Sequence, residues 1–129
     1  MRKSIDDLLA EARASLHRLD PVDAYEQMQN GTVVVDTRSD EQRTQTGAIP
    51  GTINIPLSVL EWRVDPASPH RDPAIGEVTE PIILICAEGY SSSLAAKRLQ
   101  DIGFSAATDV VGGVSAWKDA SLPVVAADG

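Results

Sequence analysis

The sequence predicts an α/β fold in which a central, mainly parallel sheet is flanked by helices on both faces. Short β-branched or apolar segments alternate along the chain with segments whose apolar residues recur at helical spacing. This alternation is typical of parallel βαβ units. The chain has 129 residues, of which 43% are hydrophobic, so it can bury a core. We expect one domain over residues 1–129, with residues 1–19 as an N-terminal helical extension and residues 20–125 as the core.

Two helices are predicted before the first strand. Between residue 4 and residue 19 apolar residues recur at helical spacing, and Ser4 can cap the first turn. The second helix has Asp20 as its N-cap, Pro21 at its first position and Gly31 just past its end. The sheet is therefore expected to begin after Gly31.

Four segments are predicted as strands, at residues 32–36, 52–55, 81–86 and 107–111. The segment 81–86 is apolar on both faces, so we place it at the centre of the sheet. Proline and glycine interrupt residues 65–81, which we expect to form a loop. Further helices are expected at residues 39–46, 57–62, 92–102 and 113–120.

Charge and composition exclude several classes of protein. The net charge is -8, from 11 basic and 19 acidic residues, so a general nucleic-acid surface is not expected. No stretch approaches the roughly 20 apolar residues that span a bilayer, so no membrane partner is expected. The N-terminal residues lack the apolar segment of a signal peptide. Because a single cysteine cannot form an internal disulfide, we expect a cytoplasmic protein.

That cysteine, Cys86, ends the predicted central strand. A free cysteine is often only a small buried hydrophobic residue. Parallel sheets, however, bind ligands at the carboxyl ends of their strands, and here a short loop containing Gly89 leads directly into a helix. Backbone N–H groups of such a loop, together with the helix dipole, stabilise an anion and lower a thiol pKa. We therefore predict that Cys86 is a nucleophile.

Four segments occur in an order that is specific to one family. Residues 86–92 read Cys-Ala-Glu-Gly-Tyr-Ser-Ser, and residues 35–38 read Val-Asp-Thr-Arg. Residues 47–56 read Gly-Ala-Ile-Pro-Gly-Thr-Ile-Asn-Ile-Pro, and residues 110–117 read Val-Val-Gly-Gly-Val-Ser-Ala-Trp, with Leu-Pro-Val following at 122–124. Together these segments resemble the motifs of single-domain rhodanese-like sulfurtransferases, whose active-site loop runs Cys-x-x-Gly-x-Arg-Ser. The resemblance covers residues 20–125 and implies a five-stranded sheet.

The resemblance also implies a chemistry. The Cys86 thiolate would attack a sulfane-sulfur donor such as thiosulfate or a low-molecular-weight persulfide, and would carry the sulfur as a persulfide. The acceptor would be cyanide or a thiol, on a small molecule or on a protein. No metal or organic cofactor is implied. The predicted substrate-binding residues are those of the loop together with one arginine: Ala87, Glu88, Gly89, Tyr90, Ser91, Ser92 and Arg38.

Some positions depart from the family pattern. Ser91 stands where the loop commonly has arginine, and Glu88 adds negative charge. Because a guanidinium suits oxyanions, we hypothesise that thiosulfate is a mediocre donor and that a persulfide with less charge is preferred. Ala48 replaces the usual histidine, so that position offers no imidazole.

Asp36 and Arg38 admit two interpretations. Asp36 is expected to be structural, near the site, in an ion pair at the end of its strand. Arg38 is either its partner or the nearest cation that reaches the pocket, and Arg43 is a second candidate for that cation. Gly112 and Gly113 are expected to allow close packing.

Two other functions stay open. A Cys-loop phosphatase or arsenate reductase needs arginine six residues after the cysteine to clamp its oxyanion, but Ser92 occupies that position. A rhodanese-like module that binds a partner or senses oxidants needs no turnover, and an exposed thiol of low pKa is also an oxidation target.

Overall fold

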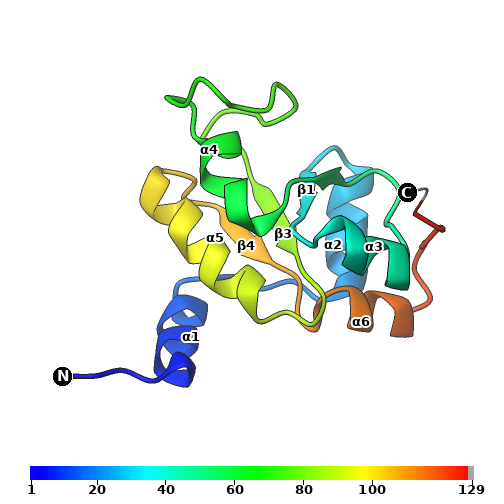
Figure 1. Ribbon diagram of the computed structural model, residues 1–129, viewed down its shortest axis with the longest axis horizontal. Coiled ribbons are helices and arrows are strands. Elements are labelled where there is room, and N and C mark those ends of the chain that lie inside the picture. Colours follow the sequence, from blue (N-terminus) through cyan, green and yellow to red (C-terminus); the bar gives the residue numbers. More distant parts are fainter. Residues whose placement is uncertain (128–129) are drawn as a thin grey trace.

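The computed structural model describes residues 1–127 (Figure 1). Along the chain its elements are α1 (Ile5–Ala14), α2 (Pro21–Gln29), β1 (Val33–Asp36), α3 (Asp40–Thr46), β2 (Ile53–Asn54), the 3₁₀ helix η1 (Leu57–Val59), α4 (Leu60–Val64), β3 (Ile82–Ile85), α5 (Ser91–Ile102), β4 (Ala107–Asp109) and α6 (Gly113–Asp119). All pairs of neighbouring strands are parallel, in the order β2-β1-β3-β4. The predicted α/β class and the internal position of residues 81–86 are confirmed.

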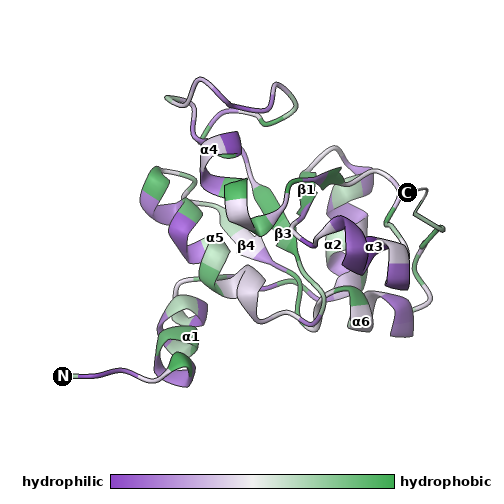
Figure 2. Ribbon diagram, in the orientation of Figure 1, coloured by the Kyte–Doolittle hydropathy of each residue, from purple (hydrophilic) through white to green (hydrophobic). Residues whose placement is uncertain are grey.

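Helices cover both faces of the sheet, and the strand residues alternate between two buried clusters. Val35 and Leu84 point to the cluster that includes residues of α4 and α5. Val34 and Ile83 point to the opposite cluster, which includes residues of α2 and α6. Figure 2 shows β3 as a hydrophobic strand between these helices. Burial on both faces explains the continuous apolar sequence of this strand.

Within residues 1–127 the sheet has four strands rather than the expected five. The position next to β4 is taken by one residue, Leu19, which forms an isolated parallel bridge with Val110. Its N–H donates to the Asp109 carbonyl at 3.0 Å, and its carbonyl accepts from the Val111 N–H at 2.9 Å. No fifth strand extends further because Pro21, which has no N–H, already begins α2.

The first helix is shorter than predicted. Helix α1 ends at Ala14 instead of continuing to residue 19. The apolar spacing continues beyond it, but Leu16 packs into the core and Leu19 joins the edge of the sheet. Ser4 caps the helix as expected, in a reciprocal pair of hydrogen bonds with Asp7. Helix α1 packs against α5 (Figure 1).

The register brings the carboxyl ends of β1 and β3 together, since Asp36 pairs with Ile85. The chain continues from these residues into Thr37 and Cys86, which therefore lie at the same edge of the sheet. None of the helices within residues 1–127 combines the length and apolarity needed to cross a membrane.

Candidate active site

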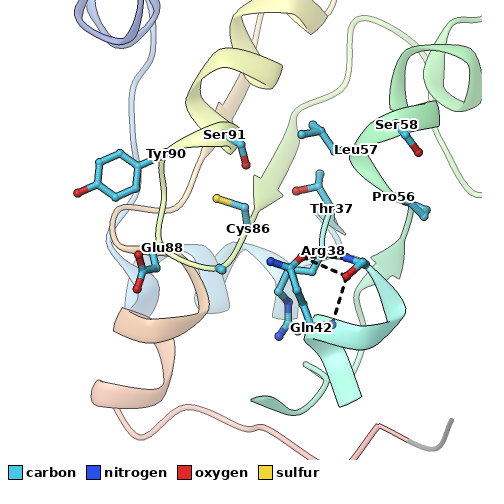
Figure 3. A pocket seen from close by; sticks show the side chains of 12 residues that line it. Thr37, Arg38, Gln42, Pro56, Leu57, Ser58, Cys86, Glu88, Tyr90 and Ser91 are labelled. Atoms are coloured by element: carbon cyan, nitrogen blue, oxygen red, sulfur yellow. Dashed lines mark hydrogen bonds between the residues drawn. The ribbon is translucent and has the colours of Figure 1, made fainter. Parts of the chain in front are cut away.

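Cys86 lies at the base of the loop that joins β3 to α5 (Figure 3). The residue is 6% exposed, and the Gly89 N–H donates to its Sγ at 3.2 Å. Gly89 adopts a φ of +84°, and a Cβ there would come within 2.7 Å of the Gly112 backbone nitrogen. Glycine is therefore needed for both the turn and the close approach, and the turn directs the Gly89 N–H at the sulfur.

Two opposing effects act on the Cys86 thiol. Burial raises its pKa, and hydrogen bonds from the hydroxyls of Ser92 and Ser91 and from the backbone N–H groups of Ser92 and Gly89 lower it. The hydrogen bonds outweigh the burial, so the pKa of Cys86 lies below its ordinary value. The Ser92 hydroxyl also donates to Asp109 at 2.7 Å, and it has a single proton. When the Ser92 hydroxyl donates to Asp109, the Ser91 hydroxyl and the backbone N–H groups remain as donors to the sulfur.

The start of α6 fixes the other side of the loop. The Val114 N–H donates to the Cys86 carbonyl at 2.9 Å, and the Ser115 N–H donates to the Ala87 carbonyl at 3.0 Å. Gly113 has a φ of +58°, and a Cβ there would overlap the Cys86 carbonyl oxygen. The predicted close-packing role of Gly113 is thus seen as direct contact between α6 and the loop.

A cavity of about 570 Å³ opens over the sulfur. Its lining comes from the Cys86 loop on one side and from the segments after β1 and β2 on the other (Figure 3). The lining residues are Thr37, Arg38, Ser39, Gln42, Pro56, Leu57, Ser58, Cys86, Ala87, Glu88, Tyr90 and Ser91. The cavity is large enough for a small-molecule donor or for a side chain of a protein. Among the predicted binding residues, Gly89 and Ser92 do not belong to this lining.

The Arg38 guanidinium is committed to other groups. It is 1% exposed, lies 2.7 Å from an Asp36 carboxylate oxygen, and also donates to Thr46 Oγ1 at 2.6 Å and to the Gly47 carbonyl at 2.8 Å. Arg43 approaches the same carboxylate at 3.9 Å. These contacts favour the interpretation of Asp36 and Arg38 as a structural ion pair over a substrate-binding role for Arg38. Glu88 is exposed at the cavity, so the charge next to the sulfur is not positive.

Sequence reasoning missed two residues that contact the loop. Arg13 at the end of α1 and Arg18 after it both donate to the Gly89 carbonyl. They lie 76 and 71 residues away from Gly89 in the chain, so no local motif marks them. Trp117, from the same segment as Gly112 and Gly113, is fully buried in the core. Within residues 1–127, no cluster of three or more His, Cys, Asp or Glu side chains is placed to hold a metal ion.

Comparison with known proteins agrees with this arrangement. The family model described as Rhodanese-like domain matches residues 20–120. The chain belongs to this family. The adenylyltransferase and sulfurtransferase uba4 of Ogataea parapolymorpha is 33% identical over 99 residues, which are 74% of this chain and 23% of that protein. The chain thus spans about a quarter of the length of that curated relative.

Two solved structures are also similar. One is a Rhodopseudomonas palustris protein of unknown function described as a possible tyrosine phosphatase, with a TM-score of 0.87, 34% identity and coverage of 96% of both chains. The other is a rhodanese-related protein of Thermoplasma volcanium, with a TM-score of 0.67, 29% identity and coverage of 85% of this chain and 98% of that one. The coverage in the first case includes most of the N-terminal extension.

Proposed function

We propose that this protein is a sulfurtransferase in which the Cys86 thiolate takes sulfane sulfur from a donor and passes it to a thiophilic acceptor. The observation that carries the proposal is the cradle around Cys86 Sγ, in which the Gly89 N–H donates at 3.2 Å and the thiol pKa is lowered. The family assignment and the relative named as a sulfurtransferase support the same chemistry.

The transfer proceeds in two displacements at sulfur. With a persulfide donor, the Cys86 thiolate attacks the terminal sulfur of the donor, the donor S–S bond breaks, and the electron pair leaves with the donor thiolate. The new Cys86–S–S⁻ group carries one negative charge, which the loop N–H groups and the Ser91 hydroxyl stabilise. The acceptor, cyanide or a thiolate, then attacks the terminal sulfur and releases the Cys86 thiolate. No further cysteine and no oxidant is required.

The charge at the cavity suggests which donor is preferred. Arg38 is committed to Asp36, and the exposed Glu88 adds a carboxylate at the cavity. Thiosulfate carries two negative charges and needs a cation for tight binding. A persulfide carries at most one negative charge on its reacting sulfur group and avoids this cost, and we therefore propose it as the better donor, with a small thiol or a thiol on a protein as acceptor.

The phosphatase alternative that the Cys86 loop raised is also suggested by the description of the Rhodopseudomonas palustris protein as a possible tyrosine phosphatase. Phosphoryl transfer needs a guanidinium directed at the equatorial oxygens. Ser92 stands six residues after Cys86, and its hydroxyl donates to Asp109 at 2.7 Å. This geometry favours sulfur transfer over phosphate hydrolysis.

Turnover assays separate these functions. Thiocyanate formation from cyanide is measured with glutathione persulfide and with thiosulfate as donors, and p-nitrophenyl phosphate hydrolysis is measured in parallel, each with Cys86→Ser as control. We expect Cys86-dependent thiocyanate formation, a higher kcat/KM for the persulfide, and no Cys86-dependent phosphatase activity. Phosphate hydrolysis without thiocyanate formation would refute the proposal.

A further inference from the structure

The Gly89 carbonyl, in the loop that carries Cys86, accepts hydrogen bonds from two arginines. Arg13 Nη2 donates to it at 2.7 Å, and Arg18 Nη2 donates to it at 2.9 Å. Both donors are charged, and charged donors form shorter and stronger hydrogen bonds than neutral ones. Both arginines precede residue 20, where the match to the family model begins.

Each arginine is also held by a second contact. Arg13 Nε donates to Ser93 Oγ at 3.1 Å, and its guanidinium lies 5.6 Å from the centre of the Tyr90 ring. Arg18 Nε donates to Asp109 Oδ1 at 2.8 Å. Asp109 is fully buried and also accepts from the Ser92 and Ser93 hydroxyls at 2.7 and 2.8 Å. The two guanidinium groups are therefore fixed to the first turn of α5 and to the end of β4.

This contact determines how the Gly89–Tyr90 peptide is oriented. The peptide is trans, so its C=O and N–H point in opposite directions. With the carbonyl held by Arg13 and Arg18, the Tyr90 N–H is directed away from the two arginines. Two charged donors on the carbonyl also polarise the peptide, which strengthens its N–H as a donor.

The arginines complete a set of outward carbonyl contacts. The Cys86 and Ala87 carbonyls are held by the N–H groups of Val114 and Ser115 at the start of α6. The Gly89 carbonyl lies beyond these contacts and has the arginines instead. Gly89, whose carbonyl the arginines hold, also donates its own N–H to Cys86 Sγ at 3.2 Å, so the arginines fix the residue that supplies this donor.

We propose that Arg13 and Arg18 are positioning residues of the Cys86 loop, and that Arg13 supplies from the N-terminal segment positive charge that the loop itself lacks. By fixing the Gly89 carbonyl they hold Gly89 where its N–H donates to Cys86 Sγ, which stabilises a thiolate or persulfide anion on Cys86. The inference rests on the proposed function for its role in sulfur transfer, while the effect on the thiolate is independent of any sulfur donor.

Arg13→Gln tests the proposal more cleanly than a change at Arg18, since Arg18 also neutralises the buried Asp109. The matched control is Arg98→Gln, which removes the same charge from an exposed position on α5, 67% exposed and 3.5 Å from Glu61. The rate of Cys86 alkylation by iodoacetamide is measured against pH in the intact chain. Persulfide formation with glutathione persulfide is followed in parallel by intact mass.

We expect Arg13→Gln to slow alkylation about three- to tenfold at pH about 6.5, whereas Arg98→Gln matches the wild type. At pH about 10, where the thiol is ionised in every variant, the rates converge. If the substitution instead disturbed the loop so that iodoacetamide could not reach the sulfur, alkylation would be slower at every pH. Identical pH profiles for Arg13→Gln and Arg98→Gln would overturn the proposal.

Arg13→Lys provides a second variant if circular dichroism shows that Arg13→Gln does not fold. A lysine ammonium cannot present the fork that reaches Gly89 and Ser93 together. We expect alkylation about twofold slower than in Arg98→Lys at pH about 6.5, and equal rates would overturn the positioning role. If the wild type forms no persulfide while the Arg13 variants still shift the alkylation profile, sulfur transfer fails and the positioning role stands.

Discussion

Replacing Gly113 by alanine tests whether α6 holds the Cys86 loop by direct contact. The φ of Gly113 is +58°, and a Cβ there would overlap the Cys86 carbonyl oxygen and come within 2.8 Å of the Ala87 carbonyl carbon. The added methyl group must therefore push the helix and the loop apart. This separation would lengthen the hydrogen bonds from Val114 and Ser115 to the loop carbonyls, which are now 2.9 and 3.0 Å.

The magnitude follows from two contributions. A left-handed backbone costs an alanine about 1–2 kcal/mol, and two weakened backbone hydrogen bonds cost about 0.5–1.5 kcal/mol each. Gly113→Ala is thus expected to lower the free energy of unfolding by about 2–5 kcal/mol. Gly31→Ala is the matched control, because Gly31 also has a positive φ, of +101°, but nothing lies within 4 Å of its would-be Cβ. Gly31→Ala therefore loses stability only through the cost of a positive φ at alanine.

Urea denaturation followed by circular dichroism gives the two free energies, and iodoacetamide alkylation reports on the Cys86 thiolate. Gly113→Ala should lose clearly more stability than Gly31→Ala, and it alone should slow alkylation below the thiol pKa. Equal losses of stability, with the Cys86 alkylation profile unchanged in both variants, would refute the prediction. They would show that the contact between α6 and the loop stabilises neither the fold nor the Cys86 thiolate.

Three other predictions concern the site. Ser91→Arg places a cation at the cavity and should raise kcat/KM for thiosulfate about tenfold relative to glutathione persulfide; equal changes for both donors would contradict the charge argument. Because the folded-state pKa of Cys86 is lowered, its thiolate contributes stability that is fully present above pH about 8.5 and is lost as the pH falls through the folded-state pKa. The unfolding free energy of the wild type minus that of Cys86→Ser should therefore rise with pH in urea titrations over this window, and a flat difference would count against the lowered pKa. Asp36→Asn leaves the buried Arg38 without its charged partner and should cost about 3–5 kcal/mol in urea denaturation, whereas a loss below about 1 kcal/mol would show that the pair is not structural.

Local patterns in the sequence predicted most of the fold. The apolar segment around Ile83 and Leu84 reads as a buried strand because both of its faces are covered, and the structure confirms its place inside the sheet. The helical spacing of apolar residues predicted a first helix that was too long. Leu16 and Leu19 continue the helical pattern, but Leu16 packs in the core and Leu19 joins the sheet edge. The spacing of apolar residues is a local signal, so it cannot show that a residue pairs with a strand that is distant in sequence.

The candidate site was predictable only as far as its local motifs reach. The position of Cys86 follows from the strand, loop and helix signals that surround it. The direction of the Arg38 side chain depends on contacts with Thr46 and Gly47, so the sequence left both interpretations of Arg38 open. The contacts of Arg13 and Arg18 with Gly89 depend on how α1 packs against α5, which only the tertiary structure reveals.

The most direct test of sulfur transfer is the intact mass of the protein after a single exposure to glutathione persulfide. Sulfur transfer through Cys86 predicts the addition of one sulfur atom to the wild type and none to Cys86→Ser. Cyanide should remove the added sulfur and yield one thiocyanate for each sulfur lost. A wild-type protein that gains only oxygen atoms, with no sulfur that cyanide can remove, would contradict sulfur transfer and indicate an oxidant sensor instead.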